Sequence, residues 1–129
     1  MIVIDCSAVV DALVADENAQ GLRNRMAEED LHAPALLDFE VVAALRGMVI
    51  GSRLTPSRAD DALTDFDDLA IERWPSADGL RRRAFQLRHN VSAYDAAYLA
   101  LAEALGCPLL TRDSRLRTAT GHHVKVEVR

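Results

Sequence analysis

Short apolar runs alternate along the chain with longer segments in which apolar residues recur every three to four positions. The short runs are rich in β-branched residues or are closed by proline or a polar residue, which is typical of strands buried in a parallel sheet. They predict five strands, at residues 1–5, 31–33, 71–74, 108–111 and 124–128. The last of these alternates between apolar and polar residues, so we expect it at an edge of the sheet.

The segments between the runs have helical spacing and recognisable ends. Ser7 is the expected cap of the first helix, Pro34 the expected first turn of a long one, and Thr55-Pro56 the start of another. Helices are predicted at residues 7–14, 17–27, 34–51, 55–69, 76–88 and 92–106, with a short helical turn around Leu116. Strands that alternate with helices predict an α/β fold of three layers, with a central parallel sheet flanked by helices on both faces.

The segment 92–106, SAYDAAYLALAEALG, is the helix around which the rest of the chain can be placed. Ser92 is a good N-cap, Asp95 lies where a carboxylate favours the helix dipole, and Gly106 supplies a left-handed stop. Apolar residues cover the helix on nearly all sides, so we expect it to be buried against both the sheet and other helices. Taken alone, Asp95 is an ordinary capping residue.

Length and composition narrow the range of proteins further. A chain of 129 residues, 50% of them hydrophobic, predicts a single domain spanning residues 1–129. Neither a secretory signal nor an apolar run long enough to cross a bilayer is present, so we expect a cytoplasmic protein with no membrane association. Cys6 and Cys107 match no zinc or disulfide spacing and are expected to be reduced and buried.

The net charge of −5 is unevenly distributed. Residues 1–78 hold sixteen acidic and six basic side chains, whereas residues 79–129 hold four acidic and nine basic ones. A basic surface can therefore coexist with an acidic pocket, and the negative total does not exclude a nucleic-acid partner.

Three carboxylates are expected near one edge of the predicted sheet. Asp5 ends the first strand, Asp113 follows the fourth, and Asp95 opens the helix that leads into that fourth strand. Ligands of open α/β sheets bind beyond the carboxyl ends of the strands. Carboxylates that gather there repel one another unless a cation intervenes, and Mg²⁺ or Mn²⁺ prefers such oxygen ligands. This arrangement is suited to phosphodiester hydrolysis.

A fourth acid is expected on the long helix at residues 34–51, where two positions compete. Glu40 shares a face with Leu37 and Val41, so it projects from an apolar stripe. Asp38 shares its face with Val42, Leu45 and Val49, and periodicity does not choose between the two acids.

Four segments resemble the motifs of the PIN-domain nucleases, and most closely those of the VapC-type ribonuclease toxins of toxin–antitoxin systems. The segments are DCSA at 5–8, EVVAAL at 40–45, SAYDAAYLALA at 92–102 and LLTRDSRL at 109–116. The resemblance covers nearly the whole chain and implies a PIN-like domain whose acidic quartet is Asp5, Glu40, Asp95 and Asp113. It thereby selects Glu40 over Asp38.

The resemblance also implies roles within the site. Asp5 and Asp95 are the expected direct magnesium ligands, and Glu40 and Asp113 are expected to complete the site or bind through water. Ser7 and Thr111 each lie two residues from an acid, so in an extended backbone their hydroxyls would point to the same side as that acid. Arg112 would point the other way, as a salt-bridge, partner or phosphate contact. Cys6 departs from the small or aliphatic residue expected beside Asp5.

By resemblance, the protein is expected to be a magnesium-dependent endoribonuclease toxin held inactive by a VapB-type antitoxin. Mn²⁺ is the expected substitute metal, RNA the substrate and a homodimer the assembly. Two alternatives are a non-catalytic PIN-like interaction module and a metal-dependent phosphatase with Asp5 as nucleophile. A phosphatase of that kind often has a second aspartate two residues on, where this chain has Ser7.

Several features lie outside the quartet. His122-His123 is expected to be solvent-exposed, and the run Arg81–Arg83 is either a solvated helix face or an RNA-backbone contact. The helices at 36–50 and 59–69 are expected to expose more apolar surface than one domain needs. By resemblance, they form a groove for the antitoxin, with an acidic outer face around Asp60 and Asp61.

Overall fold

The structure, a computed structural model, describes residues 1–15 and 17–129. Its strands are β1 (Ile2–Ile4), β2 (Leu31–Pro34), β3 (Ile71–Trp74), β4 (Leu109–Thr111) and β5 (Val126–Val128). They form one sheet in the order β3-β2-β1-β4-β5, and every neighbouring pair is parallel. The predicted parallel sheet is therefore confirmed. β5 lies at an edge as expected, although it begins at Val126 rather than Val124.

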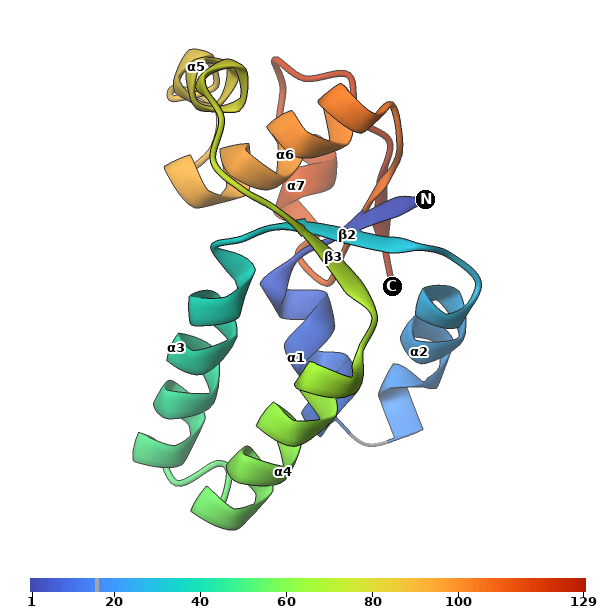
Figure 1. Ribbon diagram of the computed structural model, residues 1–129, viewed down its shortest axis with the longest axis vertical. Helices are drawn as coiled ribbons and strands as arrows, with labels where there is room; N and C mark the ends of the chain where they lie inside the picture. The colour runs from blue at the N-terminus through green and yellow to red at the C-terminus, as the bar shows by residue number, and fades with distance from the viewer. Residues whose placement is uncertain (16) are drawn as a thin grey trace.

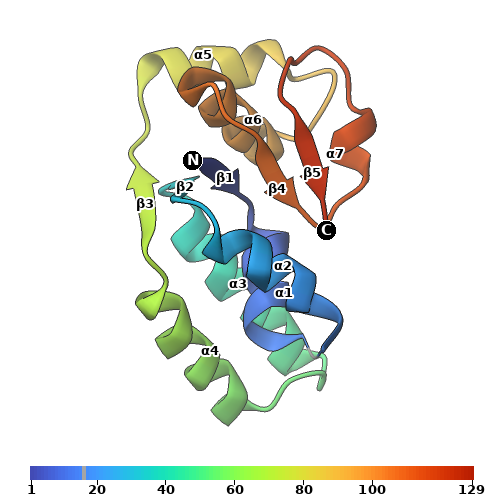
Figure 2. The same ribbon diagram turned by 90° about the vertical axis from the view of Figure 1, so that its right-hand side faces the viewer.

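The helices lie in two layers on either side of this sheet. They are α1 (Cys6–Val14), α2 (Gln20–Ala27), α3 (Leu37–Ile50), α4 (Pro56–Asp68), α5 (Asp78–Gln86), α6 (Ala93–Leu105) and α7 (Arg115–Thr118), with a 3-10 turn η1 (Glu17–Ala19). Figure 1 shows α1, α3 and α4 on one side of the strands and α5 and α6 on the other, and Figure 2 shows the same layers from the side. The predicted three-layer α/β/α fold is confirmed.

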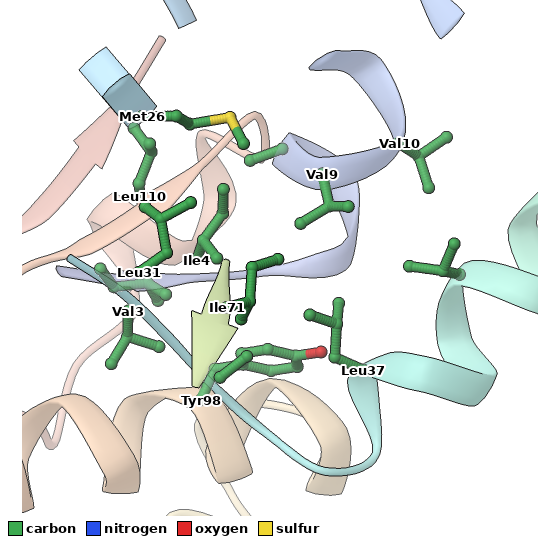
Figure 3. Close-up of a cluster of buried hydrophobic side chains, with 14 of the residues drawn as sticks. Val3, Ile4, Val9, Val10, Met26, Leu31, Leu37, Ile71, Tyr98 and Leu110 are labelled. Atoms are coloured by element: carbon green, nitrogen blue, oxygen red, sulfur yellow. The ribbon is translucent and has the colours of Figure 1, made fainter. Parts of the chain in front are cut away.

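The core lies on both faces of β1, the middle strand. Ile2, Val3 and Ile4 are completely buried, and so is Leu99 of α6. Figure 3 shows side chains from α1, α3 and α6 converging on these strands. Each such side chain contributes about 1.5–3 kcal/mol on burial. The expectation that α6 is buried between the sheet and other helices is confirmed, since it contacts β1, β2 and β4 on one side and α5 on the other.

Two predicted helix starts and one stop are confirmed. The Ser92 hydroxyl accepts a hydrogen bond from the backbone N–H of Asp95, and the Thr55 hydroxyl accepts one from Arg58 with Pro56 at the first helical position. Gly106 ends α6 with φ at +65°, a left-handed conformation that glycine adopts without a Cβ penalty.

Three other predicted helix starts are wrong. α1 is capped by Asp5 rather than Ser7, because the carboxylate at the strand end reaches the N–H of Ala8 first. Pro34 ends β2 beside Trp74 instead of opening α3, and the next residue continues the sheet by donating to the Trp74 carbonyl. Ser76 does not cap α5. Its hydroxyl accepts from Arg81 at 2.6 Å, and Ala77 holds the cap position without a side-chain bond.

The apolar surplus expected on two helices is present on only one. α3 exposes Phe39, Val42 and Ile50, whereas α4 exposes no large apolar side chain among its described residues. The apolar residues of α4 are used against the body of the protein instead, with Ala62 and Phe66 buried. The outer face of α4 is acidic as expected, since Asp60, Asp61, Asp65, Asp67 and Asp68 are all exposed. Across the described residues, no helix is both long and apolar enough to span a bilayer.

The strand order fixes where a site can form. The chain proceeds from β1 outward to β2 and β3, then returns to the other side of β1 with β4 and β5. The switch point in strand order is therefore the gap between β1 and β4. Asp5 follows β1 and Thr111 ends β4, and the register that pairs Ile4 with Leu110 brings these two residues side by side.

Candidate active site

Asp5 lies at the switch point and is 6% exposed. Its Oδ1 accepts hydrogen bonds from the Ser7 hydroxyl at 2.7 Å and from the backbone N–H of Ala8 at 3.0 Å. Its Oδ2 accepts one from the Thr111 hydroxyl at 2.5 Å. The carboxylate that caps α1 is thus fixed at both oxygens by groups from α1 and β4.

Ser7 and Thr111 are both placed beside Asp5, as expected from their spacing. The reason differs for Ser7, which lies in the first turn of α1 and not in an extended strand. Its hydroxyl also accepts from the backbone N–H of Arg112, while the Thr111 hydroxyl accepts from that of Asp113. These bonds connect the end of β1 to the segment that follows β4.

Glu40 approaches the same region from α3. It is half-buried, and its Oε1 accepts a 2.6 Å hydrogen bond from the hydroxyl of Tyr98 on α6. Asp38, the competing acid, instead pairs with Arg73 of β3 at 2.9 Å. The structure therefore turns Glu40, and not Asp38, toward α6.

Tyr98 is a residue that the sequence analysis did not single out. It is 2% exposed, and Figure 3 shows its ring directed from α6 toward the start of α3. A tyrosine on an otherwise apolar buried helix needs a partner for its hydroxyl, and that requirement was the available signal. Its position three residues after Asp95 places it on the same side of α6.

The electrostatics show that Asp5, Glu40 and Asp95 lie within reach of one another. Burial raises the pKa of Asp5, and the nearby carboxylate of Asp95 raises it further, against the lowering effect of its hydrogen bonds. Burial likewise raises the pKa of Glu40, with further increases from Asp95 and Asp5. The charge of Asp95 thus disfavours the charged forms of Asp5 and Glu40, and a bound cation would relieve this repulsion.

Asp95 occupies the first turn of α6 and is half-buried. Its backbone N–H is the group that Ser92 caps, so the helix start holds the residue in place. The capping role expected for this segment therefore belongs to Ser92, and the carboxylate of Asp95 lies on the side of the other two acids.

Asp113 is engaged elsewhere in the structure. Both of its carboxylate oxygens accept from the guanidinium of Arg115, and Oδ1 also accepts from the Arg115 backbone N–H. This pairing lowers the pKa of Asp113. Across residues 1–15 and 17–129, no group of three His, Cys, Asp or Glu side chains is arranged to hold a metal ion directly.

The flanking residues have mainly structural contacts. Arg112 pairs with Asp11 at 2.8 Å and donates to the carbonyl of Arg129, so of its three expected roles the structure shows the salt bridge. Cys6 and Cys107 are free but only half-buried, not fully buried as expected. Burial next to Glu40 and Asp5 raises the pKa of Cys6 to about 12, which keeps it an unreactive thiol.

The arginine run at 81–83 divides between roles. Arg82 forms an exposed pair with Asp78, whereas Arg83 is half-buried and binds Glu103 and the carbonyl of Gly121. Arg81 is exposed, and its guanidinium donates a hydrogen bond to the hydroxyl of Ser76. His123 is exposed as expected, but His122 is not: its ring is half-buried and its Nδ1 accepts a hydrogen bond from the N–H of Val124.

An apolar hollow of about 600 Å³ lies beside the start of α6. It is bounded by α5, α6 and the segments that follow β2 and β3, and its lining includes Leu36, Trp74, Leu80, Phe85 and Tyr94. Phe85 and Tyr94 are each 66% exposed. Tyr94 is the residue before Asp95, so the hollow borders the first turn of α6, which also carries this acid.

Comparison with known proteins agrees with this architecture. The family model described as "PIN domain" matches residues 2–121. The sequence is 37% identical over 128 residues to "Ribonuclease VapC12" of Mycobacterium tuberculosis, covering 99% of this chain and 98% of that protein. It is 46% identical over 120 residues to "Ribonuclease VapC1" of the same organism, covering 92% and 90%.

The fold is likewise similar to that in a solved structure of DNA-bound VapBC from Salmonella typhimurium. The TM-score is 0.71 at 14% identity, over 98% of this chain and 96% of that one. The sheet, its switch point and the motifs define a PIN-domain protein. The chain belongs to the PIN-domain family and, within it, to the VapC-type members.

Proposed function

We propose that this protein is a magnesium-dependent endoribonuclease of the VapC toxin type. One observation carries the proposal: carboxylates from β1, α3 and α6 converge at the switch point, where Asp95 and burial raise the pKa of both Asp5 and Glu40. A bound cation would favour the charged form of such a cluster. The relatives named ribonucleases supply the class of substrate.

The donor chemistry of the cluster fits Mg²⁺, with Mn²⁺ as a substitute. The residues offer only hard carboxylate oxygens, and Mg²⁺ usually takes one or two of these and keeps several waters. We assign direct contact to Asp5 and Asp95, and contact through water to Glu40 and Asp113. When bound, the ion lowers the pKa of a water molecule and stabilises charge on the phosphodiester.

The remaining roles belong to side chains that hold these acids. Ser7 and Thr111 orient the two oxygens of Asp5, and Tyr98 orients Glu40. The structure does not favour the phosphatase alternative. Ser7 occupies the position where such a phosphatase often has its second aspartate, and the Ser7 hydroxyl donates to Asp5. The interaction-module alternative would be favoured by a broken quartet, and all four acids are present.

Two substitutions test the assignment. Asp5→Asn and Asp95→Asn should each lower Mg²⁺-dependent cleavage of RNA by on the order of a hundredfold or more. The fold should remain intact, since an amide oxygen can still accept at the cap and the repulsion between the acids is reduced. Asp61→Asn, on the exposed outer face of α4, is the matched control. Cleavage at the wild-type rate in both site variants would refute the site.

We also propose the partners and setting of the activity. A VapB-type antitoxin would inhibit the enzyme by docking on the apolar face of α3 at Phe39 and Val42, and by directing an arginine toward Asp5 and Asp95 in competition with the metal. The acidic outer face of α4 would attract a basic partner segment. The chain would act in the cytoplasm as one domain, paired with a second copy through the apolar hollow beside Asp95.

A further inference from the structure

Arg115 forms a fork-like ion pair with Asp113, two residues away. Its Nε lies 3.0 Å from Oδ1 and 3.2 Å from Oδ2, and its Nη2 lies 2.7 Å from Oδ2. Both oxygens of the fourth acid are therefore occupied by a guanidinium, in the geometry that gives carboxylate–arginine pairs their strength.

The same guanidinium is also influenced by the acidic cluster. The hydrogen bonds that Arg115 donates to Asp113 raise the pKa of Arg115, and the charge of Asp95 raises it further. Asp113, by contrast, is not among the groups that raise the pKa of Asp5 or Glu40. The guanidinium that is hydrogen-bonded to Asp113 is thus also within electrostatic range of Asp95.

We propose that Arg115 is an internal counter-cation that competes with the divalent ion for Asp113. The inference rests on the proposed function, because it takes the four acids as one metal site. While the ion pair is closed, both carboxylate oxygens of Asp113 are occupied by the guanidinium and are withheld from the ion. Binding of the ion then requires Arg115 to swing away, and its side chain, 87% exposed, is free to do so.

The competition is expected to be modest in size. Exposed ion pairs are weak, so a dication can displace Arg115 from Asp113, but its apparent affinity is lowered because the pair must first be broken. Removing the arginine also removes repulsion between its charge and the incoming ion. Together these effects predict that loss of the guanidinium tightens metal binding by about three- to tenfold.

The test measures Mn²⁺ binding to the full chain without RNA, by electron paramagnetic resonance of the free ion. Arg115→Gln should lower the Kd by that factor relative to wild type, and Arg115→Lys, which keeps the charge but loses the fork, should fall between them. Arg117→Gln is the matched control, because Arg117 is exposed on the same short helix and its guanidinium has no partner among the described residues. It should leave the Kd unchanged.

The outcomes separate this inference from the proposed function. If Asp5→Asn and Asp95→Asn lose Mn²⁺ binding but Arg115→Gln binds as wild type or more weakly, only the competition is refuted. If Asp5→Asn and Asp95→Asn bind Mn²⁺ as wild type does, the metal site itself is misassigned. A higher salt concentration should weaken the ion pair and reduce the difference in Kd for Mn²⁺ between Arg115→Gln and the wild type.

Discussion

Tyr98 connects α6 to the acidic cluster through one hydroxyl group. It is almost fully buried, and its hydroxyl donates a hydrogen bond to Glu40 at 2.6 Å. Burial and the adjacent Glu40 charge raise the pKa of Tyr98, so the hydroxyl remains a donor at neutral pH. One residue thus satisfies its own buried polar atom and limits the orientations of an acid on a different helix.

Tyr98→Phe should therefore destabilise the protein by about 1–2 kcal/mol, because the half-buried carboxylate of Glu40 loses its donor while the packing of the ring is kept. Urea denaturation followed by circular dichroism measures the change. Tyr94→Phe is the matched control, since that ring is 66% exposed on the same helix and its hydroxyl has no hydrogen bond among the described residues. Equal stability of the two variants would show that the bond contributes nothing.

At the scale of elements, two glycines should respond to alanine with opposite signs. Gly106 ends α6 at φ +65°, where a Cβ meets no atom within 4 Å but the backbone conformation is strained for any L side chain. Gly106→Ala should cost about 1 kcal/mol for that reason. Gly79 lies in the first turn of α5 with open space around it, so Gly79→Ala should stabilise by about 0.4–1 kcal/mol. Thermal unfolding measures the change in stability of both variants. Changes of the same sign in the two variants would contradict this prediction.

A second prediction at this scale concerns the link between α2 and the edge strand β5. Arg25 Nε pairs with Glu127 at 2.9 Å, and both side chains are mostly buried. The hydrogen bond from Arg25 lowers the pKa of Glu127 below its ordinary value of 4.5. The pair therefore stabilises the fold above that pH, and the contribution is lost as the pH falls through the lowered value.

Glu127→Gln should accordingly cost on the order of 1 kcal/mol at pH 7 and almost nothing near pH 2. Denaturation of the metal-free protein across this pH range gives the difference curve against wild type. Asp67→Asn, an exposed aspartate of α4 with no ion pair among the described residues, should give a flat difference. A constant gap at all pH values for Glu127→Gln would mean that packing, not charge, links the two elements.

At the scale of the whole molecule, the apolar hollow beside α6 leads us to expect a homodimer. Light scattering of the purified protein should give twice the mass of the chain. Phe85→Asp, which places a charge on the exposed ring position of the hollow, should shift the protein to the monomer. Ile50→Asp, at the C-terminal end of α3, is the control and should remain a dimer. A monomeric wild-type protein would refute the prediction.

The pattern along the chain was enough to predict the layers of the fold and to propose the acids of the site. Short apolar runs predicted all five strands, and the segments of helical spacing between them predicted the helices. Ser92, Thr55 and Gly106 marked helix ends. These features could be predicted because their signals are local in the chain. The resemblance of its motifs to those of PIN-domain nucleases predicted Asp5, Glu40, Asp95 and Asp113 as the acids of the site. The site assignment itself stays a prediction.

The tertiary structure decided which groups contact one another, because such contacts join segments far apart in the chain. Asp38 pairs with Arg73, whereas Glu40 accepts a hydrogen bond from Tyr98. Asp5, rather than Ser7, caps α1, and its carboxylate also contacts Thr111 of the neighbouring strand. The burial that raises the pKa of Asp5 and Glu40 exists only once the sheet and α6 have packed around them. The spacing of residues within one helix or strand can be read from the sequence. The distance between Arg115 and the acids on other elements depends on how the layers pack.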